Sequence, residues 1–325
     1  MENNRKRLPA LFAGLVLTAA FLRNAAAAAA GCRSALDVCT RLLIPSLFPF
    51  FVLSGFLNRL GLPELLGQLI APAAAQLYGV SGAGASALVM GLMGGYPSGA
   101  ACIADLERGG KVAPEEAERL LGFCNNSGPA FIVGAIGLGV FGSARIGLLL
   151  YGVHVCSAFL TGLFFRQPQK ASAVPVPNAV PVSPAAALTA SVKQAVSSML
   201  NVCGFSVTFT VLLAVLDGSG LLSGLSGAAA ARFGFSAACL RAMLAGIFEL
   251  GSAAAAMQGL RLCPASLALA AFLVGWGGLS VHFQTLGLLD GCGAKGVFHI
   301  TGRLISACIG ALTAYGLGLL LPLPG

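Results

Sequence analysis

Charged residues are scarce in this chain of 325 residues. Only 9% are Asp, Glu, Lys or Arg, whereas 57% are hydrophobic, and the mean hydropathy is +0.88. A soluble domain carries about 25% charged residues, so this composition excludes an ordinary soluble protein. Several apolar runs reach the roughly 20 residues that a helix needs to cross a bilayer. We therefore predict an all-α polytopic membrane protein, which has the lipid bilayer as a partner.

Signatures of metal, redox or catalytic chemistry are also lacking. The ten cysteines include no CxxC pair, and most lie in apolar runs, where cysteine acts as a small buried hydrophobe. No His–carboxylate metal motif and no nucleophile–base spacing occurs. We expect no metal, no cofactor and no enzymatic activity. The net charge of +8 comes from scattered Lys and Arg without interleaved aromatics. It argues against a nucleic-acid partner and reports membrane topology instead.

The N-terminal 40 residues begin with Arg5-Lys6-Arg7 before an apolar run, an arrangement that also occurs in signal peptides. Because many apolar stretches follow, we predict an uncleaved transmembrane helix over residues 8–22 that continues through an alanine run toward Gly31. A second span is predicted over residues 42–60. Residues 63–78 mix Glu and Gln with leucines at helical spacing, which predicts a short amphipathic helix at the membrane interface.

Two apolar segments then contain short polar interruptions. Residues 87–106 are interrupted by GGYPSG at 94–99, and residues 116–140 by NNSGP at 125–129. Pro removes a backbone donor and Gly permits unusual dihedrals. In hydrocarbon an unwound backbone must be satisfied by protein, ion or substrate. The limbs of the first segment are too short to span, which predicts a re-entrant hairpin, whereas the second predicts a broken transmembrane helix.

The second half repeats this pattern weakly. Residues 240–262 are interrupted at Glu249-Leu250-Gly251-Ser252, and residues 265–289 at residues 276–284. The predicted crossings are residues 42–60, 116–140 and 145–165 in the first half and residues 196–216, 265–289 and 297–321 in the second, where 145–165 and 297–321 are interpreted as ordinary spans. Three is an odd number, so the second half must insert upside down. This predicts inverted repeats with the N-terminus and the linker in the cytoplasm. The predicted units are residues 1–40, a helix and loop; 41–166, a first Gate-like repeat; 167–194, a Pro-rich linker; and 195–325, a second Gate-like repeat.

The four interruptions supply the candidate binding residues. The N-termini of half-helices present unpaired N–H groups and a positive dipole end, which suit an anion. Asn and Gln side chains add both donors and acceptors, and Tyr96 or Trp276 could stack on a planar ring. The candidate substrate-binding residues are Gly95, Tyr96, Ser98, Asn125, Asn126, Ser127, Ser252, Ser280, His282 and Gln284. A purely structural role stays open, since Asn and Ser also bridge helices in lipid and a lone His is often a core residue.

Glu249 lies in an otherwise uncharged run, and an intramembrane carboxylate indicates function by default. We predict that it couples transport to a cation, with a proton and a sodium ion both left open. The alternative is a structural ion pair with an arginine such as Arg241 or Arg303.

The motifs together resemble the sporulation integral membrane proteins of the YlbJ type, in the nucleoside-recognition (Gate) domain group. They are IPSLFPFFVLS at 44–54, MGLMGGYPSGA at 90–100, FCNNSGP at 123–129, GIFELGS at 246–252 and GWGGLSVHFQ at 275–284. The resemblance covers almost the whole chain from about Arg41 onward. That family is similar to concentrative nucleoside transporters, which implies paired re-entrant hairpins and broken helices.

The resemblance also implies a role in endospore formation. For the best-understood branch of this family, the resemblance implies passage of dipicolinate from mother cell to forespore across the outer forespore membrane. This bacterial membrane is therefore the expected location. A small-molecule substrate is thus the expected partner, and a homo-oligomer is compatible with the architecture. Two other functions stay open: a nucleoside or nucleobase carrier, and a non-transporting membrane scaffold needed for spore maturation.

Overall fold

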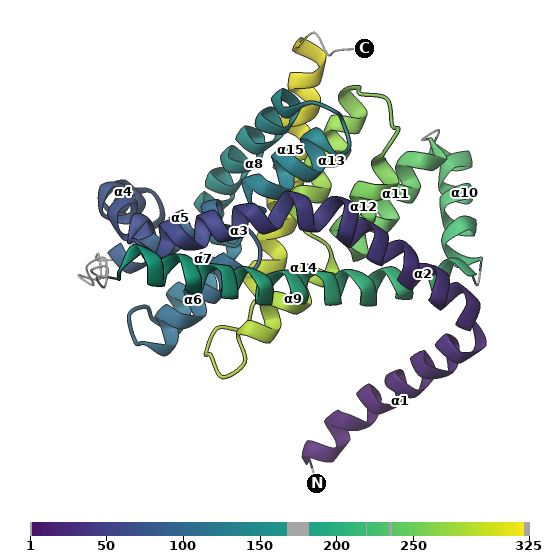
Figure 1. Ribbon diagram of the computed structural model, residues 1–325, viewed down its shortest axis with the longest axis horizontal. Coiled ribbons are helices and arrows are strands. Elements are labelled where there is room, and N and C mark those ends of the chain that lie inside the picture. The colour runs from purple at the N-terminus through teal and green to yellow at the C-terminus, as the bar shows by residue number, and fades with distance from the viewer. Residues whose placement is uncertain (1, 168–181, 219, 234–235, 322–325) are drawn as a thin grey trace.

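The computed structural model describes residues 2–167, 182–218, 220–233 and 236–321 (Figure 1). Every regular element in these ranges is helical. Within these ranges five helical segments are long and apolar enough to cross a membrane, or six if the bent pair of α4 and α5 is counted as one span. Leucines such as Leu69 and Leu312, both 76% exposed, cover the outer surface, as lipid contact requires. The prediction of an all-α polytopic membrane protein is confirmed.

The N-terminal region differs from the predicted helix that continues toward Gly31. Helix α1 (Glu2–Arg23) ends before Asn24, and α2 (Ala25–Val38) continues through η1 (Cys39–Leu43) into α3 (Ile44–Arg59). The alanine run therefore belongs to the second span, which is 35 residues long. The π-helical turn η1 ends two residues before Pro45, whose missing N–H and bulky ring disturb the regular hydrogen-bond ladder.

The rest of the first half contains the predicted interruptions. Its elements are α4 (Leu62–Tyr78), α5 (Gly82–Gly94), α6 (Ser98–Arg108), α7 (Pro114–Cys124), η2 (Ala130–Leu138) and α8 (Ala144–Phe164). Helix α4 ends at Gly79 in the left-handed conformation, and the chain turns by 103° into α5. The breaks between α5 and α6 and between α7 and η2 coincide with the Gly- and Pro-containing segments. Both predicted interruptions are therefore present as breaks between helices, whereas the re-entrant course of the first segment and the membrane crossing of the second stay predictions.

The second half has its elements in the same order. They are α9 (Pro184–Gly218), α10 (Leu221–Phe233), α11 (Ala237–Phe248), α12 (Leu250–Met257), α13 (Pro264–Trp276), α14 (Leu279–Leu288) and α15 (Val297–Leu320). Helix α9 begins at Pro184, inside the range predicted to be linker, because Pro is well suited to the first helical turn. The remainder of the predicted Pro-rich linker falls largely outside the described residues. The inverted orientation of the two halves stays a prediction.

Two long helical rods cross an upright bundle (Figure 1). The α2–α3 rod and α9 pack side by side, and each is 35 residues long. At 1.5 Å per residue such a rod measures about 52 Å, which exceeds the roughly 30 Å hydrocarbon core, so it must be strongly tilted in a bilayer. The bundle consists of α8, α13 and α15, which pack against one another.

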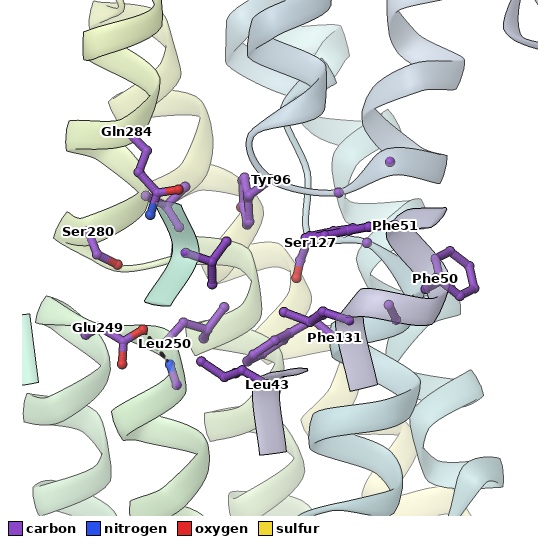
Figure 2. Close-up of a pocket in the computed structure, with 18 residues that line it drawn as sticks. Leu43, Phe50, Phe51, Tyr96, Ser127, Phe131, Glu249, Leu250, Ser280 and Gln284 are labelled. Carbon is purple, nitrogen blue, oxygen red and sulfur yellow. Dashed lines mark hydrogen bonds between the residues drawn. The ribbon is translucent and has the colours of Figure 1, made fainter. Parts of the chain in front are cut away.

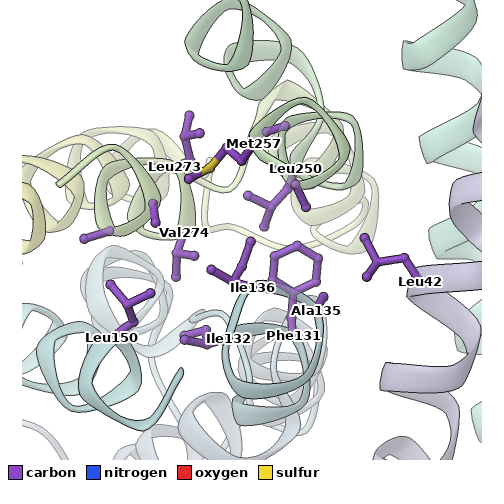
Figure 3. Close-up of a cluster of buried hydrophobic side chains, with 14 of the residues drawn as sticks. Leu42, Phe131, Ile132, Ala135, Ile136, Leu150, Leu250, Met257, Leu273 and Val274 are labelled. Carbon is purple, nitrogen blue, oxygen red and sulfur yellow. The ribbon is translucent and has the colours of Figure 1, made fainter. Parts of the chain in front are cut away.

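The largest hydrophobic core joins the two halves (Figure 3). Ile132 and Ile136 from η2 and Leu150 from α8 pack in one cluster with Met257 from α12 and Leu273 from α13, and all five are at most 1% exposed. Burying a side chain of this size contributes roughly 1.5–3 kcal/mol in water. In lipid the same close packing acts through van der Waals contact. This cluster fixes the broken helices of one half against those of the other.

Candidate functional site

The four interruptions meet around one cavity of about 60 Å³ (Figure 2). Each helix break, together with the first turns of the helix that follows it, contributes at least two lining residues, although the breaks lie far apart in the sequence. The cavity is lined by Gly94, Gly95, Tyr96, Ser127, Gly128, Glu249, Leu250, Gly251, Ser280, Val281 and Gln284 from the breaks, and by Leu43, Leu47, Phe50, Phe51, Ala130, Phe131 and Val202. Six predicted site residues therefore share one space: Gly95, Tyr96, Ser127, Glu249, Ser280 and Gln284.

The cavity has two chemically different walls (Figure 2). Glu249, Ser280 and Gln284 form a polar wall, and aromatic side chains such as Phe51 and Phe131 form the opposite one. Ser280 and Gln284 are four residues apart on α14, so they lie on one helix face. A planar ligand with polar substituents suits such a space, with its ring on the aromatic side and its hydrogen-bonding groups on the polar side.

Tyr96 lies between the two walls and joins the first break to the fourth. Gly95 has φ +71°, and a Cβ there would come within 2.8 Å of the Gly128 nitrogen, so the backbones of the first two breaks touch. Only Gly permits both this dihedral and this approach. The Tyr96 ring in turn packs over Gly277, where a Cβ would meet it at 3.3 Å.

The second break contains two asparagines that are fully buried behind the cavity wall. The Asn125 Oδ1 accepts from the Ala100 N–H at 3.2 Å, and its Nδ2 donates to the Thr285 Oγ1 at 2.9 Å. Asn125 thus caps α6 from another helix, and this amide of the α6 N-terminus is already satisfied. Asn125 bridges both halves, and it does not line the cavity.

Asn126 also points away from the cavity. Its Nδ2 donates to the Phe123 carbonyl at 2.7 Å, and its Oδ1 accepts from the Arg303 Nη1 at 2.7 Å. Next to it, the Ser127 N–H donates to the His154 Nε2 at 3.1 Å. Ser127 is the member of the predicted Asn-Asn-Ser cluster that lines the cavity.

Glu249 is the N-cap of α12. Its carboxylate accepts from the Gly251 N–H at 2.8 Å and from the Ser252 N–H. The positive end of the helix stabilises this negative charge. The alternative of an ion pair with Arg241 or Arg303 is wrong, because the salt bridges among the described residues are Arg41–Asp37 and Arg108–Asp105.

The Glu249 side chain is 5% exposed and lines the cavity. Each carboxylate oxygen retains a further lone pair for a cation. Among the described residues, no group of three or more His, Cys, Asp or Glu side chains is arranged as a metal site.

Two predicted serines face other spaces. The Ser98 Oγ donates weakly to the Gly94 carbonyl at 3.4 Å, and Ser98 lines recesses beside α3 and α9 instead of the cavity. The Ser252 Oγ shares a 2.6 Å hydrogen bond with the Thr210 Oγ1 of α9 and lines a recess beside α2.

The fourth break turns its aromatic residues away from the cavity. Gly277 and Gly278 have φ of +82° and +85° and separate α13 from α14 within one segment of membrane-spanning length, Pro264–Leu288. The Trp276 Nε1 donates to the Ile247 carbonyl at 3.1 Å, so Trp276 is tethered to the third break. His282 packs against Trp276 and His299, with ring centroids 4.3 and 4.9 Å apart. Neither Trp276 nor His282 lines the cavity.

From the sequence, Arg303 was predicted only as a possible ion-pair partner of Glu249. Arg303 lies on α15, a segment interpreted as an ordinary span, yet it is 0% exposed and its Nη1 is 3.5 Å from the Tyr96 hydroxyl. A signal was present, since His299 and Arg303 are four residues apart in an apolar helix of 24 residues. Ionisable side chains inside a span indicate function by default, and two on one face strengthen that indication.

Among curated proteins, the chain is similar to the sporulation integral membrane protein YlbJ of Bacillus subtilis (strain 168). The two sequences are 30% identical over 302 residues, which cover 85% of this chain and 74% of that protein. No family model matches the sequence. No solved structure matches it either.

Proposed function

Because the chain belongs to the family of the sporulation integral membrane protein YlbJ, we propose that it is a membrane transporter, and not an enzyme, for a small polar or anionic metabolite. The observation that carries this proposal is the meeting of four helix breaks around one cavity. Unwound backbone inside a span is tolerated where it lines a site or is buried in protein. A scaffold protein has no need of four such breaks at one place.

Dipicolinate, a pyridine ring with two carboxylates, is the substrate that we propose. The aromatic wall with Phe51 and Phe131 would take the flat ring. The hydroxyls of Ser127 and Ser280 and the amide of Gln284 would donate to carboxylate oxygens. The direction proposed is from mother cell to forespore across the outer forespore membrane.

Glu249 is the proposed coupling residue. A fixed carboxylate beside a dianion is repulsive unless it binds a proton or a sodium ion. Because its cap hydrogen bonds leave lone pairs free, a cation bound there would lower the repulsion and make binding of ion and substrate cooperative. The same carboxylate favours a second candidate, a nucleoside or nucleobase carrier, since a neutral polar substrate could donate to it directly.

The dipicolinate content of spores tests this proposal. Cells lacking the gene would be complemented with the wild type, with Gln284→Leu in the cavity, or with Ser98→Ala outside it. We expect the wild type and Ser98→Ala to restore dipicolinate, and Gln284→Leu to accumulate in the membrane without restoring it. Full restoration by Gln284→Leu would favour the scaffold function and overturn the transport site.

A further inference from the structure

A second group of buried polar side chains lies behind Tyr96, outside the cavity. Arg303 and His299 come from one face of α15, and His282 comes from α14. Arg303 and His299 are 0% exposed and His282 is 3% exposed. The two histidine rings are 4.9 Å apart between centroids. None of the three side chains lines the cavity.

Most hydrogen-bonding atoms of this group lack a partner among the described residues. The Arg303 Nη atoms donate to the Asn126 Oδ1, the Gly122 carbonyl and the Tyr96 hydroxyl. The Arg303 Nε and both ring nitrogens of His282 have no such partner, and His299 has only a weak contact with the Leu121 backbone carbonyl. Buried polar groups are almost always hydrogen-bonded, so a cluster of unpartnered ones points to a ligand or to solvent that enters with it.

The charge of the group points to an anion. A guanidinium is charged at any relevant pH, and every atom that Arg303 contacts by hydrogen bond is neutral. No salt bridge to it occurs in the part of the chain that the structure describes. Glu249, the acid of the cavity, caps α12 and makes no salt bridge to Arg303. A buried charge without a counter-charge is costly, so an anion that supplies one is strongly favoured.

Tyr96 separates this group from the cavity. Its side chain lines the cavity on one side, and its hydroxyl reaches the Arg303 Nη1 on the other. A ligand in the cavity would reach the Arg303 group only if the Tyr96 side chain moved aside.

We propose that Arg303, His282 and His299 form a carboxylate-binding subsite of the transport site, and that Tyr96 covers this subsite in the present conformation. The Arg303 Nε–H and one N–H from each imidazole would donate to the carboxylate, and the charge of Arg303 would select anions over neutral analogues. The inference rests on the proposed transport function and names the groups that make it selective for acids.

Trp276 gives a direct test because it is the one tryptophan of the chain and its ring centroid is 4.3 Å from that of His282. Its fluorescence in the purified full-length protein would be excited at the red edge of its absorption band, where pyridines do not absorb. Pyridine-2,6-dicarboxylate would be titrated against its neutral analogue, pyridine-2,6-dicarboxamide. We expect a saturable change with the dicarboxylate and a response at least about tenfold weaker in affinity with the diamide.

Four variants locate the effect. Arg303→Gln should abolish the preference for the dicarboxylate, whereas Arg303→Lys should retain part of it because the charge remains. Arg145→Gln, which removes an exposed arginine at the start of α8, is the matched control and should behave as the wild type. Should Arg303→Gln fail to fold, His282→Phe keeps a ring against Trp276 and removes both nitrogens. It should weaken dicarboxylate binding by about tenfold.

The subsite is overturned if Arg303→Gln or His282→Phe binds the dicarboxylate with wild-type affinity and selectivity. Uptake into proteoliposomes separates this failure from failure of the proposed function. Transport of the dicarboxylate by the wild type together with unchanged binding in Arg303→Gln refutes the subsite and leaves transport standing. A selective response that is lost in Arg303→Gln, without any uptake by the wild type, supports the subsite and refutes transport. A wild type without binding and without uptake refutes both.

Discussion

The contact between Asn126 and Arg303 gives a prediction whose size follows from the structure. Asn126→Ala removes the 2.7 Å hydrogen bond from the Arg303 Nη1 and the 2.7 Å hydrogen bond to the Phe123 carbonyl. A hydrogen bond to a charged group contributes about 1.5–3 kcal/mol, and a neutral one about 1 kcal/mol. Because Asn126 is 0% exposed, water does not replace these partners. We expect the free energy of unfolding to fall by about 3 kcal/mol.

Reversible unfolding in mixed micelles, followed by the fluorescence of Trp276, measures this change. Asn24→Ala is the matched control, since the Asn24 Nδ2 makes only a local hydrogen bond to the Ala20 carbonyl, and it should cost less than about 1 kcal/mol. A double-mutant cycle with Arg303→Gln isolates the pair, and we expect a coupling energy of about 1.5 kcal/mol or more. A coupling near zero would contradict the described packing of α15 against the second break.

Three further predictions address packing, coupling and topology. Gly302→Ala should destabilise the protein by about 1–3 kcal/mol in the same assay, because a Cβ would overlap the Gly122 carbonyl. Gly316→Ala is the control and should not destabilise the protein, because a Cβ there meets open space. Equal stability of the two variants would count against the close crossing of α15 and α7. Glu249→Gln should abolish the dependence of uptake on a proton or sodium gradient, measured in proteoliposomes with imposed gradients; wild-type dependence would exclude Glu249 as the coupling residue. Cysteines introduced into residues 168–184 should react with an impermeant maleimide only from the cytoplasm; labelling from outside would overturn the predicted topology.

The positions of the helix breaks could be predicted from the sequence because their causes are local. Pro97 and Pro129 remove donors, and the Gly277-Gly278 pair ends α13 with two positive φ angles. The composition was likewise enough to predict a membrane protein, because a chain in which only 9% of the residues are charged is unlike a soluble domain. The predicted end of the N-terminal helix was wrong. Alanine is apolar and a strong helix former, so the run at residues 25–30 fits equally well at the end of the first helix or at the start of the second.

The direction of each polar side chain could not be predicted, because contacts between distant residues decide it. Asn125 and Asn126 bind partners that lie 160 and 177 residues away in the chain. Glu249 satisfies the start of its own helix instead of an arginine. The role of Arg303 depends on the passage of α15 behind Tyr96, which the sequence does not show.

Uptake of radiolabelled dipicolinate by purified protein in proteoliposomes tests the central claim most directly. We expect saturable uptake by the wild type. We expect this uptake to be lost in Gln284→Leu and in Ser280→Ala, which change the polar wall of the cavity. Ser98→Ala, outside the cavity, should transport normally. Wild-type uptake in both cavity variants would contradict the claim that the four helix breaks form the transport site.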